Sequence, residues 1–159
     1  MKKLKVETSY EVYEISELEG EYKRLYDIAY EASEKAYAPY SKFYVGAALL
    51  LGNGEILSAN NQENVAYPSG LCAERTVLFY AGANYPGEVV KVLAIAAEHK
   101  GIHEDFITPC GACRQVMLET ETRQGQPMRV LLCGAKEAFL FSSAESLLPL
   151  CFSKFGDER

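Results

Sequence analysis

The sequence lacks an apolar run long enough to cross a bilayer. Its longest apolar runs, such as Val92–Ala97, are far shorter than the roughly 20 residues that a spanning helix needs. The basic stretch Met1–Lys5 is not followed by the apolar segment of a secretory signal peptide. These absences predict a cytoplasmic protein with no membrane partner.

An excess of basic residues is also missing. The chain has 16 Lys and Arg against 22 Asp and Glu, which gives a net charge of −6. Nonspecific nucleic-acid affinity comes mainly from Lys and Arg neutralising phosphates, so this balance argues against a polynucleotide partner. A small neutral or weakly charged substrate fits the composition better.

The chain has few cysteines and nothing that divides it into parts. In the cytoplasm thiols stay reduced, so the five cysteines are better explained as metal ligands, nucleophiles or core residues than as disulfides. No internal repeat, low-complexity tract or linker is present. We predict one domain over residues 1–159, in which residues 1–15 form either a short strand or an extended N-terminal arm.

The first strong pattern is helical. Ser16–Glu19 has the Ser-x-x-Glu form of a capping box, which satisfies free N–H groups at a helix start. Apolar residues then recur every three or four positions, and Pro39 ends the run. The pattern predicts a helix from Ser16 to Tyr37. Its inner face would contain Leu18, Tyr22, Leu25, Ile28, Ala29, Ala32 and Ala36.

A hairpin is predicted next. The strand-like runs 45–51 and 55–60 flank Gly52-Asn53-Gly54. Asn-Gly between two strands is a strong hairpin signal because the favoured turn needs positive φ at both central residues. A second helix begins near Cys72, after a polar, turn-rich segment. Its inner face is predicted to contain Ala73, Val77, Tyr80 and Ala81.

The second half alternates strands and helices. Val89–Ala97 is almost continuously apolar, which is typical of a strand covered on both faces. A charged loop over 98–105 follows it. The remaining predicted elements are a helix at Cys110–Thr120 with Val116 and Met117 inward, strands at Val130–Cys133 and Phe139–Phe141, and a last helix at Ala144–Leu150. Parallel neighbours need a crossover helix, so we predict an α/β fold, a three-layer α-β-α sandwich around a central mixed sheet.

Three cysteines carry the most informative pattern. Cys72 is followed by the pair Cys110-x-x-Cys113, and all three fall at predicted helix starts. There the helix dipole favours a negative sulfur and lowers the thiol pKa. A catalytic zinc site uses three protein ligands and leaves the fourth position for water. We therefore predict that these cysteines bind one Zn²⁺.

Two residues beside Cys72 complete the predicted chemistry. Glu74 is free to take a proton from a metal-activated water and deliver it to a substrate nitrogen. Three thiolates on a divalent ion leave a net charge of −1. This charge reduces the ion's ability to lower the pKa of its bound water. We hypothesise that Arg75 donates hydrogen bonds to the cysteine sulfurs and offsets this charge.

The same residues admit plainer interpretations. A Cys-x-x-Cys pair also occurs in redox proteins and in structural zinc sites. Cys133 and Cys151 have no paired spacing and are interpreted as apolar packing. His99 and His103 lie in the charged loop and are interpreted as solvated rather than metal-ligating.

Three segments carry a specific resemblance. They read YSKFYVGAA at 40–48, NQENVAYPSGLCAER at 61–75 and PCGACRQ at 109–115. In this order, over about Ser16 to Phe152, the chain resembles the small, homotetrameric cytidine deaminases. It departs from them at Tyr44, where the family often has Pro, and at Gln62, where an apolar residue is usual. Neither departure touches the cysteines or Glu74.

The resemblance implies a reaction. Cytidine and 2′-deoxycytidine would be hydrolysed to uridine and 2′-deoxyuridine with release of ammonia, as in pyrimidine salvage. Zinc on Cys72, Cys110 and Cys113 would activate the water that attacks C4 of the cytosine ring, an arrangement common to zinc deaminases. Glu74 would protonate N3 and then the departing amine.

The resemblance also implies the residues that bind the nucleoside. Asn61 and Glu63 match the ribose-binding pair, and a plainer alternative is that Asn61 bonds to the turn backbone. Phe43 matches the aromatic residue that packs on the pyrimidine, although it could instead be a core residue. The backbone at Ala73 matches a contact to the base.

The resemblance implies a homotetramer with sites at subunit interfaces, and it assigns two further aromatic residues. Tyr67 matches a residue that completes a neighbouring subunit's site, and Phe152 matches a carboxy-terminal aromatic residue that closes the pocket. Both could instead fill a subunit interface without touching substrate.

Three rival functions remain at this point: a deaminase of another cytosine compound such as blasticidin S, polynucleotide editing, and a non-catalytic protein with structural zinc. Structural zinc would need a fourth ligand, for which Cys133 is the candidate.

Overall fold

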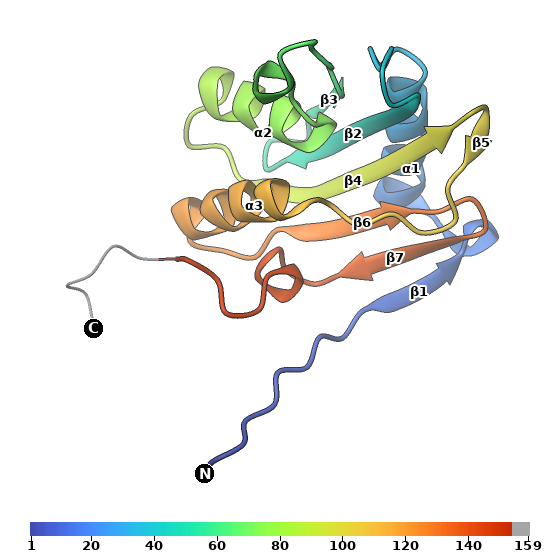
Figure 1. Cartoon of the computed structure of the whole chain (residues 1–159). Helices are drawn as coiled ribbons and strands as arrows, with labels where there is room; N and C mark the ends of the chain where they lie inside the picture. Colours follow the sequence, from blue (N-terminus) through green and yellow to red (C-terminus); the bar gives the residue numbers. More distant parts are fainter. Residues whose placement is uncertain (154–159) are drawn as a thin grey trace.

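A mixed β-sheet forms the middle layer of the protein, with α1 on one face and α2 and α3 on the other (Figure 1). The computed structural model describes residues 1–153, so residues 154–159 of the predicted domain lie outside the described part. The elements are β1 (Glu11–Glu14), η1 (Ile15–Glu17), α1 (Gly20–Ser33), β2 (Phe43–Leu51), β3 (Ile56–Asn60), η2 (Tyr67–Ser69), α2 (Ala73–Asn84), β4 (Val90–His99), β5 (Ile102–His103), α3 (Gly111–Gln124), β6 (Arg129–Cys133), β7 (Glu137–Phe141) and η3 (Glu145–Leu147).

The strand order is β1-β7-β6-β4-β2-β3, and the short β5 pairs with β4. Within the described strands, β4 and β6 are parallel and the other neighbours are antiparallel. Helix α3 makes the crossover that this parallel pair requires. The prediction of an α/β sandwich with a mixed sheet is confirmed. In the described part, no helix combines the length and apolarity needed to span a membrane.

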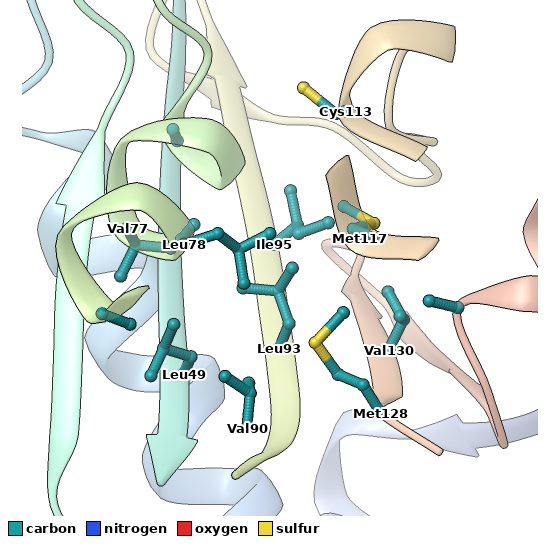
Figure 2. Close-up of a cluster of buried hydrophobic side chains, with 14 of the residues drawn as sticks. Leu49, Val77, Leu78, Val90, Leu93, Ile95, Cys113, Met117, Met128 and Val130 are labelled. Carbon is teal, nitrogen blue, oxygen red and sulfur yellow. The ribbon is translucent and has the colours of Figure 1, made fainter. Parts of the chain in front are cut away.

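The sheet separates two buried clusters, and β4 contributes to both. Leu93 and Ile95 face α2 and α3, where they pack with Val77 and Met117 (Figure 2). The alternate residues of β4, Ala94 among them, face α1. This alternation agrees with the prediction of a strand covered on both faces.

Helix α1 lies so close to β2 that the contact requires glycine at position 46. A Cβ atom there would lie 1.9 Å from the carbonyl oxygen of Ala29 and 2.4 Å from the backbone nitrogen of Ser33. Backbone atoms cannot move aside by a rotamer change, so a larger residue must displace the whole helix. Gly46 therefore sets the spacing between α1 and the sheet.

Gly46→Ala is expected to lower the free energy of unfolding by about 3 kcal/mol, the upper end of the usual cost of overpacking a core. Urea unfolding of the purified protein measures this loss. Gly52→Ala is the matched control, because a Cβ there would meet the flexible Glu88 side chain at 3.2 Å. Its cost should stay below about 1 kcal/mol. Equal losses in the two variants would contradict this account of the α1 contact.

The predicted limits of the first helix are wrong at both ends. Ser16 lies in the short 3₁₀ turn η1, whose capping box joins Glu14 and Glu17, and α1 begins at Gly20. At the other end α1 stops at Ser33. The backbone N–H of Tyr37 donates to Asn61 instead, at 3.0 Å, which places this segment beside residues 61–63. Tertiary pairing therefore ends the helix before Pro39 does.

The hairpin is confirmed, but its predicted turn is wrong. Gly54 has φ +91°, while Asn53 is not in the positive-φ region. The turn is a longer loop closed by a bond from the Leu51 N–H to the Glu55 carbonyl at 2.9 Å.

In α2, Ala73, Val77 and Ala81 are buried as predicted, whereas Tyr80 is 53% exposed, so its predicted inward position is also wrong.

The N-terminal segment forms the short strand that was one of its two predicted alternatives, whereas two later segments differ from the prediction. Residues 11–14 form the edge strand β1, and Tyr10 just before it packs on Phe141 at 5.1 Å between ring centroids. The predicted charged loop contains the end of β4 and the strand β5. Where a last helix was expected at Ala144–Leu150, the 3₁₀ turn η3 forms, because Pro149 disfavours a helical conformation at Leu148, whose φ is −135°.

Candidate metal centre and substrate cavity

Two helix starts bring three cysteine sulfurs together. Cys72 is the N-cap of α2, Cys110 is the N-cap of α3, and Cys113 lies in the first turn of α3. Their Sγ atoms all lie within 4.8 Å of one another, and those of Cys110 and Cys113 are 3.5 Å apart. Figure 2 shows Cys113 at the start of α3, beyond Met117 and the rest of the labelled cluster. All three are free thiols.

This group fits a zinc ion with an open coordination position. Sulfurs that bind one tetrahedral zinc at about 2.3 Å lie roughly 3.8 Å from each other, within the observed spread. Cys133, the candidate fourth ligand, is buried in the cluster on the α1 face of the sheet. Among residues 1–153, Cys72, Cys110 and Cys113 are the one group of His, Cys, Asp or Glu side chains with metal-site spacing. His99, His103 and Cys151 are not in it.

The surroundings of the sulfurs favour a thiolate. The Cys113 thiol hydrogen-bonds to Cys72 and lowers the pKa of Cys72 to about 5, with a further contribution from Arg75. The same interaction raises the pKa of Cys113. Arg75 Nη2 donates to the Cys72 Sγ at 3.7 Å. Its buried Nε atom has no partner within the described residues, so a second donor is available beside the cluster.

Glu74 lies buried beside the same cluster, in the first turn of α2. Its side chain is 4% exposed, and burial raises the pKa of its carboxyl. The negative Cys72 sulfur raises this pKa further. A carboxyl with a raised pKa can accept and release a proton near neutral pH. The arrangement therefore supplies a metal site and, next to it, a group that can move protons.

A cavity of about 470 Å³ opens beside Cys72 and Arg75. Three residues predicted to bind substrate also line it: Asn61, Glu63 and Tyr67. The prediction did not include the other lining residues, which are Tyr40, Ser41, Gln62, Asn64, Gly70 and Leu71. All of these lie in or next to the segments 40–48 and 61–75, so their position in those segments was a signal for them.

Asn61 and Glu63 hold the loop that leads into β2. The Asn61 Oδ1 accepts from the Val45 N–H at 2.8 Å, and its Nδ2 donates to the Phe43 carbonyl at 2.9 Å. The Glu63 carboxylate accepts from the Tyr40 N–H at 2.9 Å, and the hydroxyl of Ser41 lowers its pKa. The simpler interpretation of Asn61 as a backbone-bonding residue thus describes its contacts in this structure. Both residues also face the cavity.

Three of the predicted substrate-binding residues, Phe43, Ala73 and Phe152, are not among the residues that line the cavity. Phe43 begins β2, and its ring lies 6.0 Å from that of His99. Ala73 is fully buried directly after Cys72. Phe152 is 61% exposed, and its carbonyl accepts from Gln115 Nε2 at 2.9 Å. Tyr67 is 78% exposed. Tyr67, predicted to complete a neighbouring subunit's site, and Phe152, predicted to close the pocket, therefore leave much of their surface exposed in the single chain.

Known proteins resemble the chain along most of its length. Residues 20–126 match the family model for the cytidine and deoxycytidylate deaminase zinc-binding region. A cytidine deaminase of Sporosarcina psychrophila is 43% identical over 124 residues, which cover 78% of this chain and 85% of that protein. A cytidine deaminase of Halalkalibacterium halodurans is 45% identical over 91 residues, covering 57% of this chain and 65% of that one.

Solved structures show the same likeness. The crystal structure of a cytidine deaminase from Burkholderia pseudomallei is 41% identical, with a TM-score of 0.68, and the match covers 82% of this chain and 98% of that one. The corresponding structure from Mycobacterium tuberculosis is 32% identical, with a TM-score of 0.64, and covers 84% and 98%.

Proposed function

The chain belongs to the cytidine and deoxycytidylate deaminase family, and on that premise we propose that it hydrolyses cytidine and 2′-deoxycytidine to uridine and 2′-deoxyuridine. The enzyme is a zinc-dependent hydrolase that acts on a C–N bond. The observation that carries the proposal is the three-sulfur group with the buried Glu74 carboxyl beside it. Water supplies the new oxygen at C4, and the amino group leaves as ammonia.

The roles divide between the metal ligands and Glu74. Cys72, Cys110 and Cys113 hold the zinc, which when bound lowers the pKa of water enough to supply a nucleophile near neutral pH. Glu74 accepts the proton that the attacking water loses. It delivers this proton to N3 of the ring, and it then takes a second proton from the new hydroxyl at C4 and delivers it to the departing amine. Its burial supports this role, because a desolvated carboxyl holds its proton more readily than an exposed one.

The cavity residues bind the rest of the nucleoside. Asn61 and Glu63 face the cavity and offer amide and carboxylate groups, which suit the ribose hydroxyls. The loop that they hold carries Phe43, which packs on the pyrimidine ring. The backbone at Ala73 contacts the base. A binding role and a role in holding the loop are compatible, since one carboxylate accepts several hydrogen bonds.

The proposal includes a homotetramer in which neighbouring subunits complete each site. Its support is the exposure of aromatic side chains in the cavity lining, on α2 and near the end of the described residues: Tyr67, Phe79, Tyr80 and Phe152 are each at least half exposed. Large exposed apolar patches usually mark interaction surfaces. Light scattering should give a molar mass four times 17.6 kDa. A fully active monomer would contradict this part of the proposal.

We also propose a cytoplasmic role in pyrimidine salvage. Three cysteine ligands need to remain reduced, which the cytoplasm favours. The products, uridine and 2′-deoxyuridine, are nucleosides that a salvage route consumes.

Arg75→Gln is expected to lower turnover, zinc retention or both by roughly 10- to 100-fold, the usual effect of removing a group that bonds to a metal ligand. The reason is the loss of the guanidinium that donates to Cys72. Steady-state kinetics and the zinc content per subunit are measured on the same preparation. Arg123→Gln, on the exposed end of α3, is the control and should change neither. Full activity with full zinc content in Arg75→Gln would refute the charge-balancing role.

Substrate comparison tests the assignment of the cavity. Cytidine and 2′-deoxycytidine should be deaminated far faster than free cytosine, which lacks the ribose that Asn61 and Glu63 bind. Cytidine monophosphate and blasticidin S should also be poor substrates. A preference for either of these over cytidine would contradict the proposed substrate, although the protein would still be a deaminase.

A further inference from the structure

Arg114 follows the ligand Cys113 directly and joins two separate backbone segments. Its Nε donates to the Pro109 carbonyl at 2.8 Å, and its Nη1 donates to the Leu147 carbonyl at 2.7 Å. Pro109 immediately precedes the ligand Cys110, and Leu147 ends the turn η3. One guanidinium therefore connects the turn that carries a zinc ligand to the C-terminal segment.

The three ligands are not held equally by packing. Cys113 is completely buried within the α2 and α3 cluster, so the core fixes its position. Cys110 is exposed, and its neighbour Pro109 has no N–H with which to anchor the turn. The turn offers two backbone acceptors: the Cys110 carbonyl accepts from the Arg114 N–H at 3.0 Å, and the Pro109 carbonyl is bound by the Arg114 side chain.

The C-terminal segment is in turn held along α3. The Glu121 carboxylate accepts from the Ala144 N–H at 2.6 Å, and Gln115 donates to the Phe152 carbonyl at 2.9 Å. Buried Leu147 packs in the same cluster as Cys113. The second carbonyl bound by Arg114 is thus a fixed point, against which the guanidinium can hold the Cys110 turn.

We propose that Arg114 is a positioning residue that holds Cys110 in the place the metal requires, through the Pro109 carbonyl and against η3. This inference rests on the proposed zinc site. Arginine suits the role because its planar guanidinium presents donors in a rigid fork that reaches two carbonyls at once. A lysine has a flexible stem and can satisfy one carbonyl well, but not both in a fixed geometry.

The test uses metal binding rather than activity alone. In Arg114→Met, zinc should transfer to a coloured chelator roughly 10- to 100-fold faster than in the unaltered protein. The cobalt(II)-substituted variant should show shifted sulfur-to-metal and ligand-field absorption bands, because the Cys110 sulfur is less well placed. Arg114→Lys should give intermediate values. It also provides the same readout if Arg114→Met does not fold.

Gln124→Met is the matched control, because it removes the bonds from α3 to Val90 without touching Pro109 or η3. Its zinc transfer and cobalt spectrum should equal those of the unaltered protein, even where its thermal stability is lower. Normal zinc transfer and cobalt bands in the Arg114 variants would overturn the inference. So would the same changes in Gln124→Met, since they would indicate general loosening of α3. Failure of the unaltered protein to bind either metal would instead overturn the proposed function, and this inference with it.

Discussion

Glu74→Gln is expected to lower kcat by roughly 100- to 10,000-fold, the range that positioned proton transfer contributes to catalysis. Glutamine has nearly the same shape but cannot accept the proton of the attacking water or protonate N3. Glu74 is outside the three-sulfur group, so the variant should retain zinc. Since burial already favours the neutral form of this carboxyl, the neutral amide should be compatible with the same position in α2.

The measurement is kcat at saturating cytidine, with zinc content determined on the same sample. Glu119→Gln is a matched control because Glu119 lies on the exposed face of α3, and its kcat should remain normal. A Glu74→Gln protein with full zinc content and normal kcat would refute the proton-carrying role. A variant without zinc would show instead that Glu74 supports metal binding.

Removal of zinc by a chelator is expected to reduce activity by at least roughly 1,000-fold, because water returns from a pKa of about 7 to about 15.7. Adding zinc back should restore activity. The fold should persist without the metal, since the apolar cluster beneath the sulfurs is built from α2, α3 and the sheet. Circular dichroism and thermal unfolding, recorded before and after chelation, measure this persistence.

Two cysteine variants distinguish a zinc ligand from a buried cysteine that only packs in the core. Cys113→Ser should lose zinc and activity, whereas Cys133→Ala should keep both, because Cys133 lies in the cluster on the α1 face. A protein that unfolds on zinc removal would support the structural-zinc alternative. So would a Cys133→Ala variant that loses the metal.

The sequence predicted the metal centre because its information is local. Cys72 and Cys110 are N-cap residues, and Cys113 lies one turn further along α3, so the spacing and the helix starts together define the group. The β2–β3 hairpin was equally predictable from Asn53-Gly54. The hairpin signal lies in one short stretch, and each part of the metal centre is likewise a short local signal, although Cys72 and Cys110 are far apart in the chain.

Features that depend on distant residues were not predictable. The first helix ends early because Tyr37 bonds to Asn61. The Arg114 side chain donates to the carbonyls of both Pro109 and Leu147, which lies nearly 40 positions later in the chain. No periodic pattern records such contacts, so local propensity gave the wrong limits there.

The most direct test of the proposed function is a balance of reactants and products. Protein purified with its zinc content measured should convert cytidine to uridine and ammonia in equal amounts, with one zinc per subunit. Cytidine loss is followed by absorbance and chromatography, and ammonia by a coupled assay. No cytidine turnover by fully metal-loaded protein would contradict the proposed function.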